Sequence, residues 1–376
     1  MDGTLLDTES VFKTIVFEVC TDLGYEMTEA VHLSMVGGSH ERTNQLLVEA
    51  YGVAFPYTLF DERCRVIMRE RSHGGVPVKA GARELIGELR ERGIPCAASS
   101  DASSFAELEA FATAVGFPLI LKPRDAAGAS GTYRVDNVCE LHAAARQLAV
   151  DRGNSVAIEE FIEGHEGFYD TLTVGGRVVH EFVSHYYPNV LEAMRTRWIS
   201  PQIVVTNRID EPGYEELRAL GRRVNAELAM GTSATHMEWF YGPRGLKFSE
   251  IGARPPGVSQ WDSYNAANDI DLYREWAHAI VHVSAPGHLS RRYAAGIIAL
   301  RPDRDGHISG YQGLEEIQQR YGQWIVEAHV PDIGTATQPV EAGYMANAWV
   351  RMKHPDYDVL REMLDDVGRT VQVRAA

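Results

Sequence analysis

The stretch of sequence that most constrains the fold is FPLILKPRDAAGASGTYRV, residues 117–135. An apolar run ends in Lys122, a loop of small residues follows, and residues 133–135 have the composition of a second strand. The backbone N–H groups of such a loop form a concavity for anions, and a lysine ammonium adds a point charge. Because the pattern G-x-x-x-x-G-K-[ST] is absent, the stretch predicts a polyphosphate site of another kind, placed between two strands.

Two alternating apolar patterns follow this stretch. Residues 156–162 are predicted to form a strand that leads into a linker. The runs 169–174 and 177–184 are joined by Gly175-Gly176, and a Gly-Gly pair between alternating runs is a good hairpin signal.

A second hairpin is predicted where the runs 235–241 and 246–251 flank Gly242-Pro243-Arg244-Gly245. In an antiparallel hairpin Glu238 lies roughly opposite Glu250, with Cβ atoms about 4.5–5.5 Å apart. Two carboxylates at that distance repel each other unless a cation lies between them, and beside phosphates the expected cation is Mg²⁺. Strand parity places Arg254 on the same face, where it can stabilise a transferring phosphoryl group or a bound carboxylate.

Strand, lysine, glycine loop, second strand and paired carboxylates, in this order, resemble the ATP-grasp superfamily of ligases. The resemblance covers about residues 97–285 for the fold proper, and it extends to about 85–376 with the flanking segments. It implies an α+β (α/β) fold with the two subdomains of that superfamily and a C-terminal extension. It also implies ATP contacts from Lys122, from the loop and from the hinge, namely Gly128, Ala129, Ser130, Gly131, Glu159, Phe161, Ile162 and Glu166.

The resemblance implies a chemistry as well. Mg²⁺ or Mn²⁺ would be bound by Glu238 and Glu250, with Lys122 and Arg254 as catalytic residues. A carboxylate substrate would take the γ-phosphoryl group of ATP, and an amine or thiol would attack the resulting acyl phosphate. The superfamily pattern Glu-x-Asn-x-Arg reads here Glu250-Ile251-Gly252-Ala253-Arg254, so one usual metal ligand is missing or supplied elsewhere.

The first residues, MDGTLLDTES, resemble another family, the haloacid dehalogenase-like hydrolases of the β-phosphoglucomutase and phosphatase branch. Asp2 matches the second aspartate of their Asp-x-Asp-Gly-Thr motif, and the nucleophilic first aspartate is absent, so we expect no phosphatase activity. We predict that residues 1–95 are a truncated, mostly helical cap-like fragment with an incomplete core. The ATP-grasp domain is expected at residues 96–285, with a C-terminal α+β element at 286–376 packed on it.

Three further residues are candidate substrate contacts. Arg195 and Arg197 lie in a loop-like run between strands, where an arginine pair can bind a carboxylate; the alternative is two exposed surface arginines. His236 shares the predicted active face with Glu238, and the alternative there is a structural histidine.

Composition limits the partners. A net charge of −16 argues against nucleic acid, because phosphate backbones need a basic surface. Four cysteines without paired spacing predict neither a zinc site nor a disulfide framework. With no signal peptide or long apolar run, we expect a cytoplasmic protein that binds small carboxylate and amine substrates, contacts no membrane and allows a homodimer.

Three hypotheses for function stay open at this stage. The first is an ATP-dependent, ADP-forming ligase, weakened by the loss of an N-terminal substrate domain. The second is a haloacid dehalogenase-type phosphohydrolase, and the third is a non-catalytic ATP-binding protein.

Overall fold

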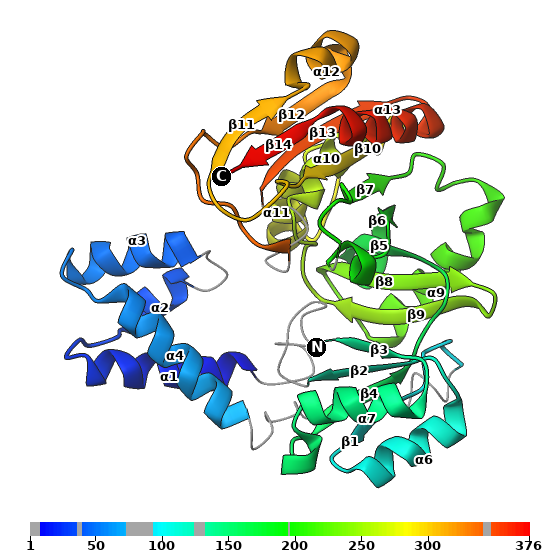
Figure 1. Cartoon of the computed structure of the whole chain (residues 1–376). Helices are drawn as coiled ribbons and strands as arrows, with labels where there is room; N and C mark the ends of the chain where they lie inside the picture. Colours follow the sequence, from blue (N-terminus) through cyan, green and yellow to red (C-terminus); the bar gives the residue numbers. More distant parts are fainter. Residues whose placement is uncertain (1–7, 36–39, 73–92, 124–131, 195, 341–346) are drawn as a thin grey trace. The chain divides into compact units, whose positions relative to one another are not determined.

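The computed structural model describes residues 8–35, 40–72, 93–123, 132–194, 196–340 and 347–376 (Figure 1). The chain divides into two compact units, of which the first contains Met1–Gly87 and Ser99–Glu159. The second contains Glu88–Ala98 and Glu160–Ala376. The predicted three-part division at residues 95 and 285 stays a prediction.

The N-terminal part of the first unit is helical. Its helices are α1 (Thr8–Asp22), α2 (Glu29–Met35), α3 (His40–Tyr51) and α4 (Tyr57–Ser72). They share a core that includes Val16, Leu47 and Phe60. Cys20 and Cys64 are buried in this core, and burial raises the pKa of their thiols to about 11 and about 12, so neither is a reactive thiolate at neutral pH. The motif at Asp2 lies outside the described residues, and the resemblance to a hydrolase cap stays a prediction.

The described residues in the rest of the first unit form a four-stranded sheet, two α-helices and a short helical turn. Its strands, in spatial order, are β1 (Ser99–Ala102), β4 (Val156–Glu160), β2 (Leu119–Pro123) and β3 (Tyr133–Val135). Its helices are α6 (Phe105–Val115), α7 (Val138–Gln147) and the short η1 (Val150–Arg152). Leu119 lies opposite Val135 in an antiparallel pair, which confirms the predicted strand–loop–strand order. Leu121, Ile158 and Leu141 of α7 are fully buried in the core between sheet and helices.

The second unit is built on an eight-stranded antiparallel sheet with the order β12-β13-β10-β7-β6-β5-β8-β9 (Figure 1). The strands are β5 (His165–Val174), β6 (Arg177–Tyr187), β7 (Gln202–Val205), β8 (Ser233–Gly242), β9 (Gly245–Gly252), β10 (Ala294–Leu300), β12 (Ile325–His329) and β13 (Ala348–His354). A two-stranded sheet pairs β11 (Ile308–Gln312) with β14 (Gln372–Ala375). The C-terminal element therefore does more than pack on the core, since β10, β12 and β13 extend the same sheet.

Helices cover both faces of this sheet. The helices of the second unit are α8 (Val190–Ala193), α9 (Glu215–Glu227), α10 (Gln260–Asn268), α11 (Leu272–His282), α12 (Leu314–Tyr321) and α13 (Tyr357–Thr370), with short turns η2 (Pro212–Tyr214) and η3 (Gly322–Trp324). Ile297 of β10 packs in one core with Tyr264 of α10, and the next residue, Ile298, packs in another with Leu364 of α13. This alternation defines an α10 face and an α13 face.

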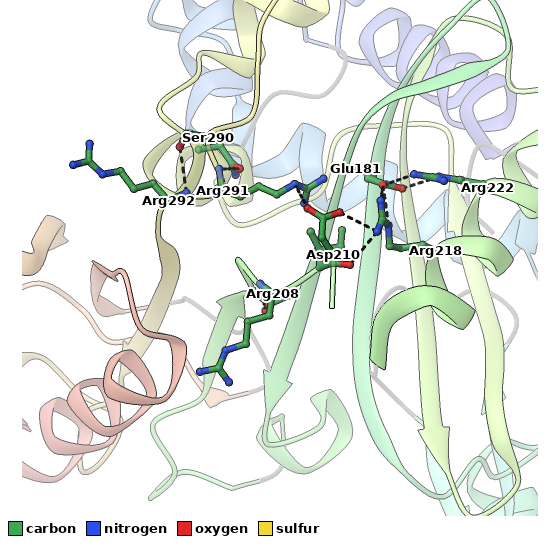
Figure 2. A network of polar contacts seen from close by, with 11 residues as sticks. Glu181, Arg208, Asp210, Arg218, Arg222, Ser290, Arg291 and Arg292 are labelled. Atoms are coloured by element: carbon green, nitrogen blue, oxygen red, sulfur yellow. Dashed lines mark hydrogen bonds and ion pairs between the residues drawn. The ribbon is translucent and has the colours of Figure 1, made fainter. Parts of the chain in front are cut away.

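On the α13 face, a buried carboxylate joins β6 to α9. Glu181, 5% exposed, accepts hydrogen bonds from Arg218 and Arg222 of α9 (Figure 2). It also accepts one from the hydroxyl of Tyr169. Arg218 also pairs with Asp210, which in turn pairs with Arg291. These contacts lie away from the α10 face and fix α9 on the sheet.

Both predicted hairpins are confirmed. Gly175 and Gly176 have φ values of 55° and 81°, as expected for the turn that joins β5 to β6. In the β8–β9 hairpin Glu238 lies directly opposite Glu250. A β-bulge between Glu238 and Trp239 produces this register, because Trp239 already pairs with Phe248 and Ser249 is left over.

Candidate active site

Glu238 and Glu250 form an acidic pair at one end of the α10 face. Glu238 is half-buried, with 22% of its side chain exposed, and Glu250 is exposed. Burial, and next the charge of Glu250, raises the pKa of Glu238 above its usual range. A cation bound between the two carboxylates would neutralise both charges, so the pair is a candidate cation site.

The structure also limits which cation fits. Within the described ranges, no group of three or more His, Cys, Asp or Glu side chains is arranged to hold a metal ion. Mg²⁺ is commonly bound by one or two carboxylates, with its other ligands from water and phosphate oxygens. The pair supplies the one or two carboxylates that Mg²⁺ takes when it is bound together with a polyphosphate.

A buried hydrogen-bonded chain supports this pair from the neighbouring strand β5. Asp170, 1% exposed, accepts from Nδ1 of His236 at 2.7 Å and from the hydroxyl of Tyr264 at 2.5 Å. Nε2 of His236 lies 3.9 Å from Oε1 of Glu238. Burial lowers the pKa of His236, but the charge of Asp170 and its hydrogen bond outweigh this, and the net shift is upward.

Asp170 and Tyr264 were not predicted from the sequence. The available signal is an acidic residue within the otherwise apolar and small-residue run of β5, GFYDTLTV. A carboxylate inside a buried strand needs partners, and such residues gather at functional sites.

Glu166, predicted to contact ATP from the hinge, is placed beside the acidic pair. It is 6% exposed, and its Oε2 accepts the backbone N–H of Val190 at 2.7 Å, at the start of α8. Burial, and then the charge of Glu238, raises its pKa. Its contact with ATP stays a prediction.

Arg254 follows the end of β9 and supplies positive charge to this region. Its charge lowers the pKa of Glu238 and opposes protonation of His236, so the three side chains lie within electrostatic reach. One guanidinium nitrogen donates to the carbonyl of Pro255 at 2.9 Å, and the side chain is otherwise exposed. The guanidinium is therefore accessible to a ligand.

In the first unit, the predicted phosphate lysine has a defined partner. Nζ of Lys122 on β2 lies 2.8 Å from Oε1 of Glu159 on β4, and each side chain is about one quarter exposed. In the second unit Glu160 pairs with Arg244, and Phe161 and Ile162 follow it. The predicted loop contacts Gly128, Ala129, Ser130 and Gly131 lie outside the described residues.

Arg197, one of the two candidate substrate arginines, is not joined to the acidic site by any contact among the described residues. Arg197 pairs with Asp305 at 2.7 Å, and Arg195 lies outside the described residues. His236 lies on the same face as Glu238, as predicted, and its contact with a substrate stays a prediction.

The raised pKa values of Glu238 and Glu166 predict an unusual pH response. Their folded-state pKa values lie above the unfolded value of about 4.3, so the unfolded chain loses these protons first as pH rises. Their contribution to stability is therefore full below that value and is lost as pH rises through the folded pKa values. Because a cation needs ionised carboxylates, stabilisation by Mg-ATP should grow over the same range.

Thermal unfolding between pH 5.5 and 8, with and without Mg-ATP, measures this response. A Mg-ATP shift that stays constant across the range would contradict it.

The fold is the ATP-grasp fold, which the chain shares with solved ligases and synthetases. The chain matches the solved L-amino acid ligase from Bacillus licheniformis over 96% of its length and 95% of that chain, with a TM-score of 0.60 and 15% identity. It also matches the carboxyaminoimidazole ribonucleotide synthase from Aspergillus clavatus, solved with ATP, over 96% of both chains, with a TM-score of 0.54 and 15% identity. The predicted fold class is confirmed.

Sequence comparison finds curated relatives of low identity. The L-arginine-specific L-amino acid ligase of Bacillus subtilis is 25% identical over 258 residues, which cover 64% of this chain and 59% of that enzyme. The chain spans 48% and 59% of the length of the first two curated relatives it matches. No protein-family model matches the chain. No helix among the described residues has both the length and the apolar character needed to cross a membrane.

Proposed function

We propose that the chain is an ATP-dependent, ADP-forming ligase that joins a carboxylate to an amine or a thiol through an acyl phosphate. The observation that carries the proposal is the Glu238–Glu250 pair, set in register by a bulge, with Arg254 beside it on an ATP-grasp fold. The similarity to L-amino acid ligases supports an amino acid as the carboxylate substrate.

Each charged residue has a role in this proposal. Glu238 and Glu250 would hold Mg²⁺ or Mn²⁺, which would neutralise charge on the β- and γ-phosphates of ATP. Lys122 would contact phosphate oxygens, and Arg254 would stabilise the negative charge of the transferring phosphoryl group. Asp170 would orient His236 beside the acidic pair.

Two displacements complete the reaction. A carboxylate oxygen of the first substrate attacks the γ-phosphorus, the bond to the β-phosphate oxygen breaks, and ADP leaves. The amine nitrogen then attacks the acyl carbon, phosphate leaves with the carboxylate oxygen, and the nitrogen loses a proton to water. Positioning and charge stabilisation supply most of the rate, so the protein needs no covalent nucleophile.

The proposal is tested by ADP release in the presence of Mg-ATP and pairs of L-amino acids. Release that requires both substrates supports the ligase. Binding of Mg-ATP with no turnover on any pair would favour the non-catalytic alternative. Phosphate release from a phosphomonoester without ATP would favour the phosphohydrolase, whose motif at Asp2 lies outside the described residues.

Replacing Lys122 by alanine should weaken ATP binding without destabilising the chain. A hydrogen bond to a charged group contributes about 1.5–3 kcal/mol, so the Kd for ATP should rise about 10- to 150-fold. The pair with Glu159 is partly exposed and contributes little to stability. Calorimetric titration with ATP measures the change. Lys13→Ala, which breaks the exposed Lys13–Glu29 pair, is the matched control and should leave the Kd unchanged.

A further inference from the structure

Helix α10 connects the acidic site to the C-terminal element. Its residues Ser263 and Tyr264 are fully buried and adjacent in sequence. Tyr264 donates to Asp170, which holds His236 beside Glu238. The orientation of His236 therefore depends on where α10 places one hydroxyl group.

A buried arginine from β13 holds the same helix. Arg351 is 1% exposed; its Nε donates to Oγ of Ser263 at 3.2 Å, and its Nη2 donates to the carbonyl of Ser259 at 3.2 Å. Its Nη1 pairs with Glu327 of β12, and its guanidinium lies 5.0 Å from the ring centre of Trp349. A buried charge persists only where such partners are in place, so these contacts hold Arg351 in one position.

The segment that Arg351 contacts is also the one that follows Arg254. Val258 and Ser259 both have left-handed backbone conformations, with φ values of 48° and 52°. Consecutive non-glycine residues in this region are strained and persist only when their surroundings hold them, a feature that gathers at functional sites. The bond from Arg351 to the carbonyl of Ser259 is one contact that holds them.

We propose that α10 is a brace through which Arg351 and Tyr264 act as positioning residues for the acidic site. Arg351 fixes the start of α10 and the segment after Arg254, and Tyr264 transmits this placement to Asp170 and His236. The expected loss of kcat rests on the proposed function. The expected change at His236 rests on the hydrogen-bonded chain alone. Through this brace the C-terminal element influences the acidic site, although none of its described residues contacts that site directly.

The test uses the full chain with Tyr264→Phe, which removes only the hydroxyl, and with Arg351→Gln. In turnover with Mg-ATP, kcat should fall about 10-fold or more in each variant while the KM for ATP is unchanged, as when residues behind metal ligands are altered. Because both act along one path, the double variant should lose less than the product of the single losses. Arg361→Gln is the matched control. Arg361 lies on α13 of the same C-terminal element, is mostly buried and stacks on Tyr187.

A readout without turnover separates this inference from the proposed function. In ¹⁵N-histidine spectra of the ligand-free protein, assigned with His236→Gln, the imidazole resonances of His236 should shift in Tyr264→Phe and in Arg351→Gln but not in Arg361→Gln. Unchanged His236 resonances in the first two variants would overturn the brace even if the ligase is active. If the wild-type chain forms no ADP, the proposed function fails, and the spectra alone then test whether α10 is a brace.

If Arg351→Gln fails to fold, two milder variants are used, and the same loss of kcat and shift of the His236 resonances are expected. Arg351→Lys keeps the charge of Arg351, and Glu327→Gln removes the negative charge of its exposed partner. Loss of kcat in step with a lowered Tm, and no shift of His236, would assign Arg351 to stability alone and contradict the inference.

Discussion

Replacing Glu238 and Glu250 together by glutamine should abolish the stabilisation by Mg-ATP while leaving the ligand-free chain at least as stable as the wild type. Glutamine keeps the shape of each side chain and removes both the cost of burying a charge at Glu238 and its repulsion by Glu250, which together raise the pKa of Glu238. Ligand at about 100 times its Kd stabilises the wild type by about 2.7 kcal/mol, a shift of several degrees, and the variant should lose this shift. The rate of ADP formation should fall about 1,000-fold, which corresponds to about 4 kcal/mol of transition-state stabilisation.

Opposite effects on stability and on binding mark a functional site. A matched control removes two charges elsewhere, through Glu215→Gln and Glu216→Gln on the exposed side of α9. Calorimetry with and without Mg-ATP should show no loss of the ligand shift in this control. A double variant of Glu238 and Glu250 that is destabilised without ligand, yet still responds fully to Mg-ATP, would assign the pair to structure.

The largest effect on stability is expected at Glu181, on the opposite face of the sheet. Burial alone raises its pKa, but hydrogen bonds from Arg222, Tyr169 and Arg218 outweigh burial and hold the pKa below its usual range (Figure 2). Glu181→Ala leaves the partly buried Arg218 without its main partner, and loss of one member of a buried pair costs about 3–5 kcal/mol. The unfolding transition should fall by roughly 10 °C.

Scanning calorimetry of the ligand-free chain measures the loss at Glu181. Glu216→Ala, the same change at an exposed site of α9, should stay within about 0.5 kcal/mol of the wild type. Because the pKa of Glu181 is depressed, its contribution is present above the unfolded value and is lost as pH falls through the folded value. A Glu181→Ala variant as stable as the Glu216→Ala control would show that the two arginines find other partners.

The acidic pair could be predicted from the sequence because alternation and a Gly-Pro-Arg-Gly turn determine which residues of a hairpin share a face. The register itself depended on a bulge. Without the bulge, Glu238 would lie opposite Ser249, and no local pattern signals the extra residue. Lys122 lies on β2 beside Glu159, and its contact with phosphate stays a prediction.

The buried hydrogen-bonded chain beside the acidic pair could not be predicted in the same way. Asp170, His236 and Tyr264 come from β5, β8 and α10, and only the folded sheet brings them within hydrogen-bond distance. Arg351 is more distant still, on a strand that joins the sheet from the C-terminal part. Long-range pairing of this kind leaves no local sequence signal, whereas the two hairpins do.

The measurement that tests ligation through an acyl phosphate most directly follows oxygen from the substrate. The chain is incubated with Mg-ATP, an amine and an amino acid whose carboxylate carries ¹⁸O, and the released phosphate is examined by mass spectrometry. We expect ADP together with phosphate that carries one ¹⁸O atom, because the carboxylate oxygen leaves with the phosphoryl group. ADP with unlabelled phosphate would mean simple ATP hydrolysis, and AMP with pyrophosphate would mean an adenylate; either result would contradict the proposed function.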